Sequence, residues 1–467
     1  MLTSTYLLRQ RRFLPLFATQ LLNAFNDNLF KNAMVLFVVY SVYNSEEAEA
    51  QFSAIASGLF ILPFFILSAL SGQLADMRDK AAIIRWVKLA EIGIMTVGGG
   101  GLLMAWQGLL TEAVAIPLML LALFAMGVHS TFFGPIKYAI LPQHLHKDEV
   151  LAGTGLVEAG TYIAILAGTI LAGFIAVEVA ALLVFVTALI GYATSRQVPP
   201  APPLIPEDHR NFESLDNLAR LACKFPGLLR GLMLLPVFLY WTVGSSVKLV
   251  NRTMHQREVF YAILAISFFW TIGAVLFIQF PPLAKNVLYA SKEVASLFLV
   301  IFSIGVAIGS VAINALLKGD VSARYSPISV LLMGAFVAAF WFVCTEWSAD
   351  VTPRELMDVA QFLAQPLAPV VLFTLLLIAI SGGMFVVPLY AFLTTKCDPS
   401  VAARMVAANN IVNSGAMVIG SLIAAGLSAA GIPLVEQVLL SAAMCLVSAW
   451  LAVRLYKAEK LALAAAC

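Results

Sequence analysis

Long apolar stretches separated by short polar loops recur along the whole chain. Each is long enough to cross a bilayer as an α-helix, which takes about 17–25 residues. The stretches predict six helices in the first part of the chain, at residues 13–43, 52–75, 81–106, 114–141, 150–176 and 179–195. Six more are expected at residues 258–284, 293–317, 326–345, 366–394, 401–429 and 433–456. Because backbone groups in lipid must bond to one another, this pattern predicts an all-α membrane protein.

Polar residues interrupt the first apolar stretch near its middle, in the segment "NAFNDNLFKNAMVLFVV" at residues 23–39. At 100° per residue, one broad arc of this helix carries Thr19, Gln20, Asn23, Asn26, Asp27 and Lys31. The opposite arc, which is expected to face lipid, carries Leu22, Phe25, Leu29, Ala33 and Leu36. A charge in mid-membrane costs about 3 kcal/mol or more. Asp27 should therefore face protein or a wet cavity, with Lys31 one turn on as its partner.

Polar and aromatic residues also lie inside later helices. Together with Asn23, Asn26, Asp27 and Lys31, the candidate substrate-binding residues are His129, Lys137, Tyr138, Glu158, Tyr162, Trp270 and Asn413. A role limited to holding helices together is the alternative, but ionisable residues inside a membrane are functional by default. Carboxylates and lysines in one cavity would suit a zwitterion, whose ammonium binds a carboxylate and whose phosphate binds a lysine.

The composition excludes several classes of protein. Of 467 residues, 61% are hydrophobic and 12% are charged, whereas a soluble domain carries about 25% charged residues. The mean hydropathy is +0.93. The net charge is only +2, so no nucleic-acid partner is expected. The five cysteines lie far apart in the sequence, so neither a disulfide framework nor a metal site is expected, and no cofactor is predicted.

The loops differ in charge in a regular way. Arg9, Arg11 and Arg12 precede the first helix, whereas the next loop, "NSEEAEAQ", contains three glutamates and no base. Basic loops continue on alternate sides, and the pair Lys285 and Lys292 is the exception. By the positive-inside rule, both ends of the chain are expected in the cytoplasm.

A segment rich in proline and charge separates the two sets of helices. The expected division is a six-helix half at 1–195, a cytoplasmic linker at 196–257 and a second half at 258–467. Within the linker, the apolar stretch at about 228–247 is long enough to span. Basic residues flank it on both sides, so it is expected to lie at the interface or to re-enter the membrane.

The two halves resemble each other in sequence. "YAILPQHLHKDEVLAGTGLVEAG" follows the fourth helix of the first half, and "YAFLTTKCDPSVAARMVAANNIVNSG" takes the same place in the second. In this alignment Tyr138 corresponds to Tyr390, and Glu158 corresponds to Asn413. Two parallel six-helix repeats are typical of one large transporter architecture.

The loop between the second and third helices, "GQLADMRDKAAIIR", resembles the signature loop of the major facilitator superfamily. Gly72, Asp76 and Lys80 match its pattern. Met77 stands where the pattern has a basic residue, and the neighbouring Arg78 partly restores that charge. The resemblance implies the major facilitator superfamily fold, with twelve helices in two pseudo-symmetric halves. It also implies that Gly72, Asp76, Arg78 and Lys80 contribute to a cytoplasmic gate. The alternative is an ordinary solvated loop.

Three segments resemble one family within that superfamily, the bacterial lysophospholipid transporters. They are "QLLNAFNDNLFKNA", "FFGPIKYAILPQHLHKDEVLAGTGLVEAGTYIAILAGT" and "FYAILAISFFWTIGAVLFIQFPPLAKNVL". The positions that match the family's pattern are Asn23, Asn26, Asp27, Asn28, Lys31, Pro135, Lys137, Tyr138, Pro142, Glu158 and Gly160. The apolar stretch at 228–247 departs from it.

The resemblance implies a flippase of the bacterial inner membrane. It would move lysophospholipids, such as lysophosphatidylethanolamine, from the outer to the inner leaflet by alternating access. An acyltransferase or acyl-ACP synthetase, separate or fused, would then act on the transported lipid.

Two other functions are alternatives, of which the residues exclude the second. A proton-coupled exporter of amphiphilic drugs would use Asp27 or Glu158 as its proton carrier. An acyltransferase would need a His-x-x-x-x-Asp pair, and none of the five histidines has Asp five positions later. We therefore expect a transporter that is not an enzyme.

Overall fold

The computed structural model describes residues 6–42, 46–204, 243–350, 356–395 and 399–466. Within these ranges, twelve helices exceed 18 residues. The first half contains α2 (Leu14–Phe37), α3 (Glu46–Met77), α4 (Lys80–Trp106), α5 (Ile116–Ala139), α7 (Val150–Phe174) and α8 (Val177–Ser195). The second half contains α11 (Arg257–Asn286), α12 (Lys292–Leu317), α13 (Ser326–Asp350), α15 (Ala368–Thr395), α16 (Ala402–Ala429) and α17 (Leu434–Ala466). Two short helices, α6 (Leu141–His144) and α14 (Val359–Leu363), lie in loops.

Each of the twelve predicted helices is present, with its ends shifted by a few residues. The largest differences are the earlier start of α3 at Glu46 and the later end of α17 at Ala466. Eleven of the described helices are long and apolar enough to cross a membrane. The remaining long helix is α2, whose polar residues lower its hydropathy. The all-α membrane fold is thus confirmed.

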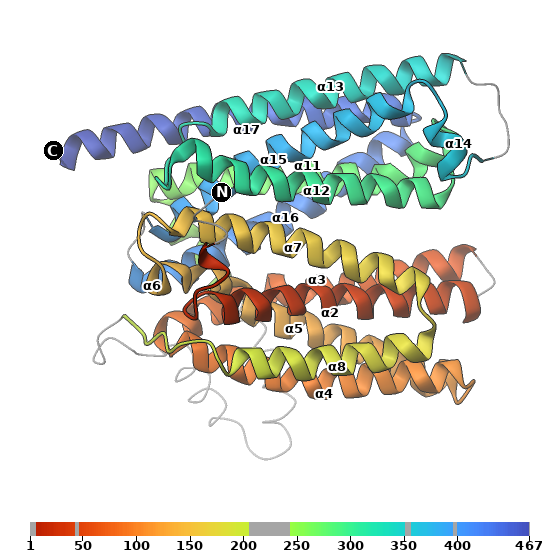
Figure 1. Cartoon of the computed structure of the whole chain (residues 1–467), viewed down its shortest axis with the longest axis horizontal. Coiled ribbons are helices and arrows are strands. Elements are labelled where there is room, and N and C mark those ends of the chain that lie inside the picture. The colour runs from red at the N-terminus through yellow and green to blue at the C-terminus, as the bar shows by residue number, and fades with distance from the viewer. Residues whose placement is uncertain (1–5, 43–45, 205–242, 351–355, 396–398, 467) are drawn as a thin grey trace.

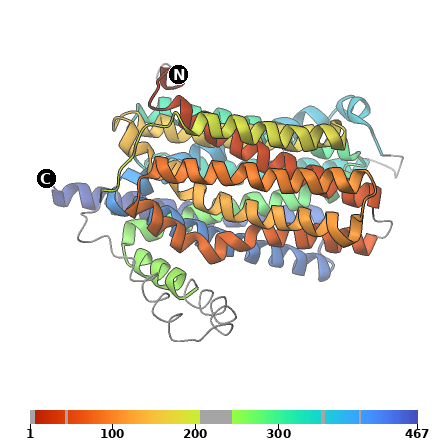
Figure 2. The same cartoon turned by 90° about the horizontal axis from the view of Figure 1, so that it is seen from below.

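The two sets of helices form two bundles that lie side by side (Figure 1). Both ends of the chain and α6 lie at one end of the molecule (Figures 1 and 2). Between the bundles, α3 packs on α16 and α7 packs on α12. Figure 1 shows α7 and α12 close together at the end that carries α6 and diverging toward the opposite end.

The loop between α3 and α4 is fixed by one carboxylate. Asp79 caps α4 by accepting hydrogen bonds from the backbone N–H groups of Ala81 and Ala82, at 2.8 and 3.2 Å. The same oxygen accepts the N–H of Ala201, at 3.2 Å, while Lys80 N–H donates to the Ala201 carbonyl. The chain after α8 is therefore docked on this loop. Most of the predicted interfacial or re-entrant segment, residues 228–242, lies outside the described residues.

The predicted lipid-facing arc of α2 is wrong in part. Leu29 is fully buried and Ala33 is 4% exposed. Both belong to an apolar cluster with residues of α3, α4, α5 and α8. The reason is that α2 packs against α7 and α8 on the side expected to face lipid. Leu22, Phe25 and Leu36, the other residues of that arc, are half-buried.

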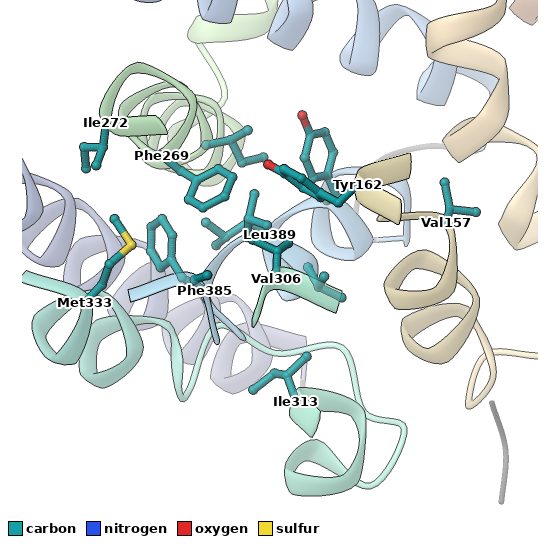
Figure 3. Packing of buried hydrophobic residues seen from close by; sticks show 14 of the residues in the cluster. Val157, Tyr162, Phe269, Ile272, Val306, Ile313, Met333, Phe385 and Leu389 are labelled. Atoms are coloured by element: carbon teal, nitrogen blue, oxygen red, sulfur yellow. The ribbon is translucent and has the colours of Figure 1, made fainter. Parts of the chain in front are cut away.

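The buried apolar residues form two clusters. The larger one runs through the second half and reaches the α6 end of the first half. Figure 3 shows part of it, where Tyr162 of α7 points toward Leu389 and Val306 of the second half. The smaller cluster fills the opposite end of the first half.

Candidate functional site

A polar layer separates the two apolar clusters of the first half. On α2, Leu16 belongs to the larger cluster and Leu29 to the smaller one. On α4 the same change occurs between Ile84 and Met95. The buried polar residues between these limits, with those at the same level of α5, include Asn23, Asn26, Asp27, Lys88, Glu91, His129 and Ser130. We call this set the polar layer.

An ion pair on α4 forms the centre of the polar layer. Lys88 and Glu91, three residues apart, are in contact and their side chains are completely buried. Glu91 Oε1 accepts a hydrogen bond from Asn26 Nδ2, at 2.8 Å. Lys88 Nζ donates to Asn23 Oδ1, at 3.3 Å. His129 Nε2 lies 3.5 Å from Glu91 Oε2.

Asp27 joins the polar layer through one of its two oxygens. Oδ2 accepts hydrogen bonds from Asn23 Nδ2, at 3.1 Å, and from Ser130 Oγ, at 2.5 Å. The predicted partner, Lys31, lies elsewhere: its Nζ stands 5.7 Å from the centre of the Phe60 ring. Among the described residues, no cation lies within 4.0 Å of Asp27. The expected Asp27–Lys31 ion pair is therefore wrong.

A second polar group lies where α5 and α7 approach the second half. Glu158, fully buried on α7, accepts a hydrogen bond from the Tyr138 hydroxyl. Lys137 is half-buried, with Nζ 3.5 Å from Thr161 Oγ1 and 4.8 Å from the centre of the Tyr138 ring. Thr161 also donates to Gln20 Oε1 of α2, at 3.0 Å.

Aromatic residues of the two halves meet beside Glu158. The rings of Tyr138 and Tyr390 are parallel within 9° with their centres 4.7 Å apart. Tyr162 stacks on Trp270, at 6.1 Å and 10°. Trp270 Nε1 donates to the Tyr390 hydroxyl, at 2.8 Å. Tyr138 and Tyr390 are equivalent in the sequence repeat, and their mutual contact is what a two-fold relation between the halves produces.

The last substrate-binding candidate, Asn413, lies in the second half. Its Oδ1 accepts a hydrogen bond from Ser267 Oγ, at 2.6 Å. Nine of the eleven candidates fall into two groups, and Lys31 and Asn413 belong to neither. The polar layer contains Asn23, Asn26, Asp27 and His129, and the interface between the halves contains Lys137, Tyr138, Glu158, Tyr162 and Trp270.

The predicted gate residues bring the two halves together at the α6 end. Asp76 is 1% exposed and accepts the backbone N–H groups of Ala403 and Arg404, at 3.0 and 3.1 Å. Arg404 Nε lies 2.9 Å from the same carboxylate. A Cβ on Gly72 would lie 2.6 Å from that of Ala407, so glycine permits this close approach. The side chain of Lys80 is buried, whereas Arg78 is exposed.

An ion pair also fastens the start of the chain at this end. Arg12 Nη2 lies 2.6 Å from Glu149 Oε1, and the backbone N–H of His146 donates to Glu149 Oε2, at 2.9 Å. Burial alone would raise the pKa of Glu149. The hydrogen bonds from His146 and Arg12 outweigh it and hold that pKa below its ordinary value.

Sequence reasoning missed Lys88 and Glu91. They follow a basic loop closely in the sequence. The signal was present: at 1.5 Å per residue, Lys88 lies about 12 Å beyond the start of α4. Opposite charges three residues apart at that depth form a pair on one helix face. In the described part of the chain, no cluster of three or more His, Cys, Asp or Glu could hold a metal ion.

The fold and the paired halves define a membrane transporter of the two-bundle type, and comparison with known proteins gives its family. The profile of the Major Facilitator Superfamily matches residues 16–420. The chain belongs to this superfamily.

Individual relatives agree with the sequence motifs. The chain is 22% identical over 430 residues to the lysophospholipid transporter LplT of Escherichia coli (strain SE11), covering 89% of this chain and 88% of the relative. It is 21% identical to LplT of Shigella boydii serotype 4 (strain Sb227), with the same coverage. The resemblance to lysophospholipid transporters is therefore confirmed.

Solved structures show the same fold. A bacterial homologue of the iron transporter ferroportin, in an outward-facing state, matches with a TM-score of 0.65 at 14% identity, over 96% of this chain and 99% of that one. The proton:xylose symporter XylE matches with a TM-score of 0.66 at 13% identity, over 97% and 96%. At these identities the likeness concerns the fold alone.

Proposed function

We propose that this transporter flips lysophospholipids, such as lysophosphatidylethanolamine, from the outer to the inner leaflet of a bacterial inner membrane. The proposal rests on one observation above all. Charged and polar side chains gather at mid-depth in the first half, and the Tyr138–Glu158 pair among them lies against Tyr390 in the predominantly apolar core of the second half. A lysophospholipid fits both features: its zwitterionic head group suits the polar side chains, and its single acyl chain suits the apolar core.

Residues of opposite charge bind the two charged groups of the lipid head group. Asp27 and Glu158 supply carboxylates for the ammonium, and Lys137 and Lys31 supply ammonium groups for the phosphate. The aromatic pairs beside Glu158 add ring faces, which attract a cation held over them. His129, Asn23, Asn26 and Asn413 are polar residues that orient these groups.

Alternating access follows from the contacts between the halves. The Asp76–Arg404 pair and the Gly72–Ala407 contact join the halves at the α6 end, which is the cytoplasmic end if the loop charges follow the positive-inside rule. This arrangement leaves substrate entry to the opposite side. Rocking of the halves would break these contacts and release the lipid toward the inner leaflet, where an acyltransferase or acyl-ACP synthetase could reacylate it.

Uptake of labelled lysophosphatidylethanolamine by spheroplasts tests the proposal. Cells with the wild-type protein should internalise the lipid, and Asp27→Asn should lower uptake at least tenfold. Glu112→Gln, at an exposed carboxylate, is the matched control and should transport normally. A wild-type protein that moves no lipid, but dissipates a proton gradient when amphiphilic drugs are added, would instead identify a drug exporter.

A further inference from the structure

The ion pair Lys88–Glu91 has no role in the function proposed above. Both side chains are completely buried, at a depth where ionised groups are costly. A buried ion pair is weak evidence for stability, because apolar residues of similar volume often do as well or better. The contacts of the pair therefore point to another reason for its presence.

The pair determines how two asparagines of α2 are oriented. An amide has an oxygen that only accepts and a nitrogen that only donates. Lys88 can only donate, so the Asn23 oxygen faces it and the Asn23 nitrogen is turned toward Asp27, 3.1 Å away. Glu91 accepts, so the nitrogen of Asn26 faces it. The two charges of α4 thus act as a donor and an acceptor that set the polar face of α2.

The orientation of Asn23 determines which oxygen of Asp27 accepts its hydrogen bond. Asn23 and Ser130 both donate to Oδ2, while Oδ1 is buried and accepts no hydrogen bond from the described residues. Lys88 and Glu91 neutralise each other, and the two donors to Asp27 are neutral groups. Asp27 therefore has no cationic partner within 4.0 Å among the described residues and keeps one oxygen open to a donor.

We infer that Lys88 and Glu91 are positioning residues, which act through Asn23 to hold Asp27 as the acceptor for the cationic group of the substrate. This inference rests on the proposed function, because it names the residue that receives the ammonium of the lipid. It also states that Lys88 itself does not bind the phosphate, since its charge is occupied by Glu91 and Asn23.

The neighbouring helix α8 offers a way to disturb the relay without removing a polar group. A Cβ at Gly191 would lie 2.8 Å from Lys88 Cε and 3.1 Å from Lys88 Nζ. Gly191→Ala would therefore displace the end of this flexible side chain. Gly100 of α4 has open space around a Cβ, so Gly100→Ala is the matched control.

The first test is transport of labelled lysophosphatidylethanolamine in proteoliposomes by Lys88→Met/Glu91→Leu, which leaves no unpaired buried charge. We expect KM to rise about tenfold, as for the loss of one hydrogen-bonded orientation, and kcat to change less than twofold. In an Asp27→Asn background the same double substitution should add no further change in KM. Gln279→Leu/Gln437→Leu removes a buried polar pair of the second half and should leave KM unaltered.

Gly191→Ala keeps every polar group and serves if the double variant does not fold. It should raise KM about threefold alone and not at all beside Asp27→Asn. A wild-type KM in either variant, or an effect that multiplies with that of Asp27→Asn, overturns the inference.

A stability cycle tests the inference without any lipid. Thermal unfolding of wild type, Asp27→Asn, Lys88→Met/Glu91→Leu and the combined variant should depart from additivity by about 3 °C or more. Strict additivity would contradict a relay between the ion pair and Asp27. This measurement separates the inference from the proposed function, because it retains its meaning if the wild type transports no lysophospholipid.

Discussion

The two halves share one topology but build their interiors differently. In the first half, a layer of buried charged and polar side chains separates two apolar clusters. In the second half, a single apolar cluster continues through α11, α12, α13 and α15. The contrast is clearest between equivalent third helices. Residues 81–106 include Arg85, Lys88 and Glu91, whereas residues 327–345 include no charged residue.

Aromatic pairs recur in the described part of the second half. Phe277 and Phe302 meet edge to face at 5.0 Å, and Phe298 contacts Phe362 of α14 at 5.9 Å. Such pairs add about 0.5–1.5 kcal/mol each beyond their burial, and they need no exact partner charge. The second half thus resembles an apolar wall, and the first a polar binding surface.

The difference teaches how a duplicated fold acquires one asymmetric site. At the interface, Tyr138 and Tyr390 remain equivalent and stack on each other. Their neighbours have diverged: Glu158 accepts from Tyr138, while the equivalent Asn413 accepts from Ser267. A carboxylate on one side and an amide on the other make the interface asymmetric, as the proposed amphiphilic substrate would require.

The largest predicted difference between the halves concerns the loss of one buried polar partner. Glu91→Leu leaves Lys88 buried without its anion, which costs about 3–5 kcal/mol. In the second half, Gln437→Leu leaves only the neutral Gln279 without this partner, at about 1–3 kcal/mol. Thermal unfolding in detergent should show a clearly greater drop for Glu91→Leu. Adding Lys88→Met should restore most of it, and equal losses in the two halves would contradict the comparison.

The second prediction concerns the contact that closes the α6 end. Asp76→Asn removes the charge that holds Arg404 and two backbone N–H groups, and such bonds contribute about 1.5–3 kcal/mol each. Spin labels at Lys147→Cys and Arg324→Cys, exposed positions in the two halves, should then show a larger population at long distances. The native cysteines are replaced first.

Asp358→Asn is the control for this measurement, because Asp358 caps α14 in a loop of the second half. It should leave the distance distribution unchanged. A distribution that Asp76→Asn does not alter would show that the gate is closed by other contacts.

Much of this fold could be predicted from the sequence, because helix length and apolar content are local properties. The twelve helices, the repeat and the signature loop all depend on residues close together in the chain. The burial of α2 could not be predicted in this way. Leu29 and Ala33 are apolar whether they face lipid or protein, so periodicity cannot distinguish the two environments.

The candidate site was predicted only in part for a related reason. Asp27 and Glu158 stand out as charges inside apolar stretches. Lys31 at one turn from Asp27 suggested a pair, but a spacing on one helix does not show which neighbours other helices bring. Lys88 of α4 contacts the polar face of α2 at Asn23, and Lys31 lies over the Phe60 ring instead of beside Asp27.

The third prediction concerns the close approach of α7 and α12. A Cβ at Gly155 would lie 2.4 Å from the Ser310 carbonyl oxygen, so Gly155→Ala must push the two helices apart. Overpacking of this kind costs about 1–3 kcal/mol, and the same spin-label pair should report partial opening. Gly173→Ala, on the same helix with open space around it, should have no such effect. Identical distance distributions for the two variants would mean that the helices adjust without separating.

The smallest expected effect is the pH dependence of stability that the Arg12–Glu149 pair gives to the first half. Glu149 has a lowered pKa, so its bond to Arg12 stabilises the fold fully above the ordinary carboxyl pKa of 4.5 and less as pH falls through the lower folded value. Wild type should therefore lose stability on acidification more steeply than Glu149→Gln. At neutral pH, where an ion pair near the protein surface contributes about 0.2–1 kcal/mol, the variant should melt only slightly lower. Unfolding temperatures between pH 3 and pH 7 check this, and curves that run parallel over that whole range would show that Glu149 is not held by Arg12.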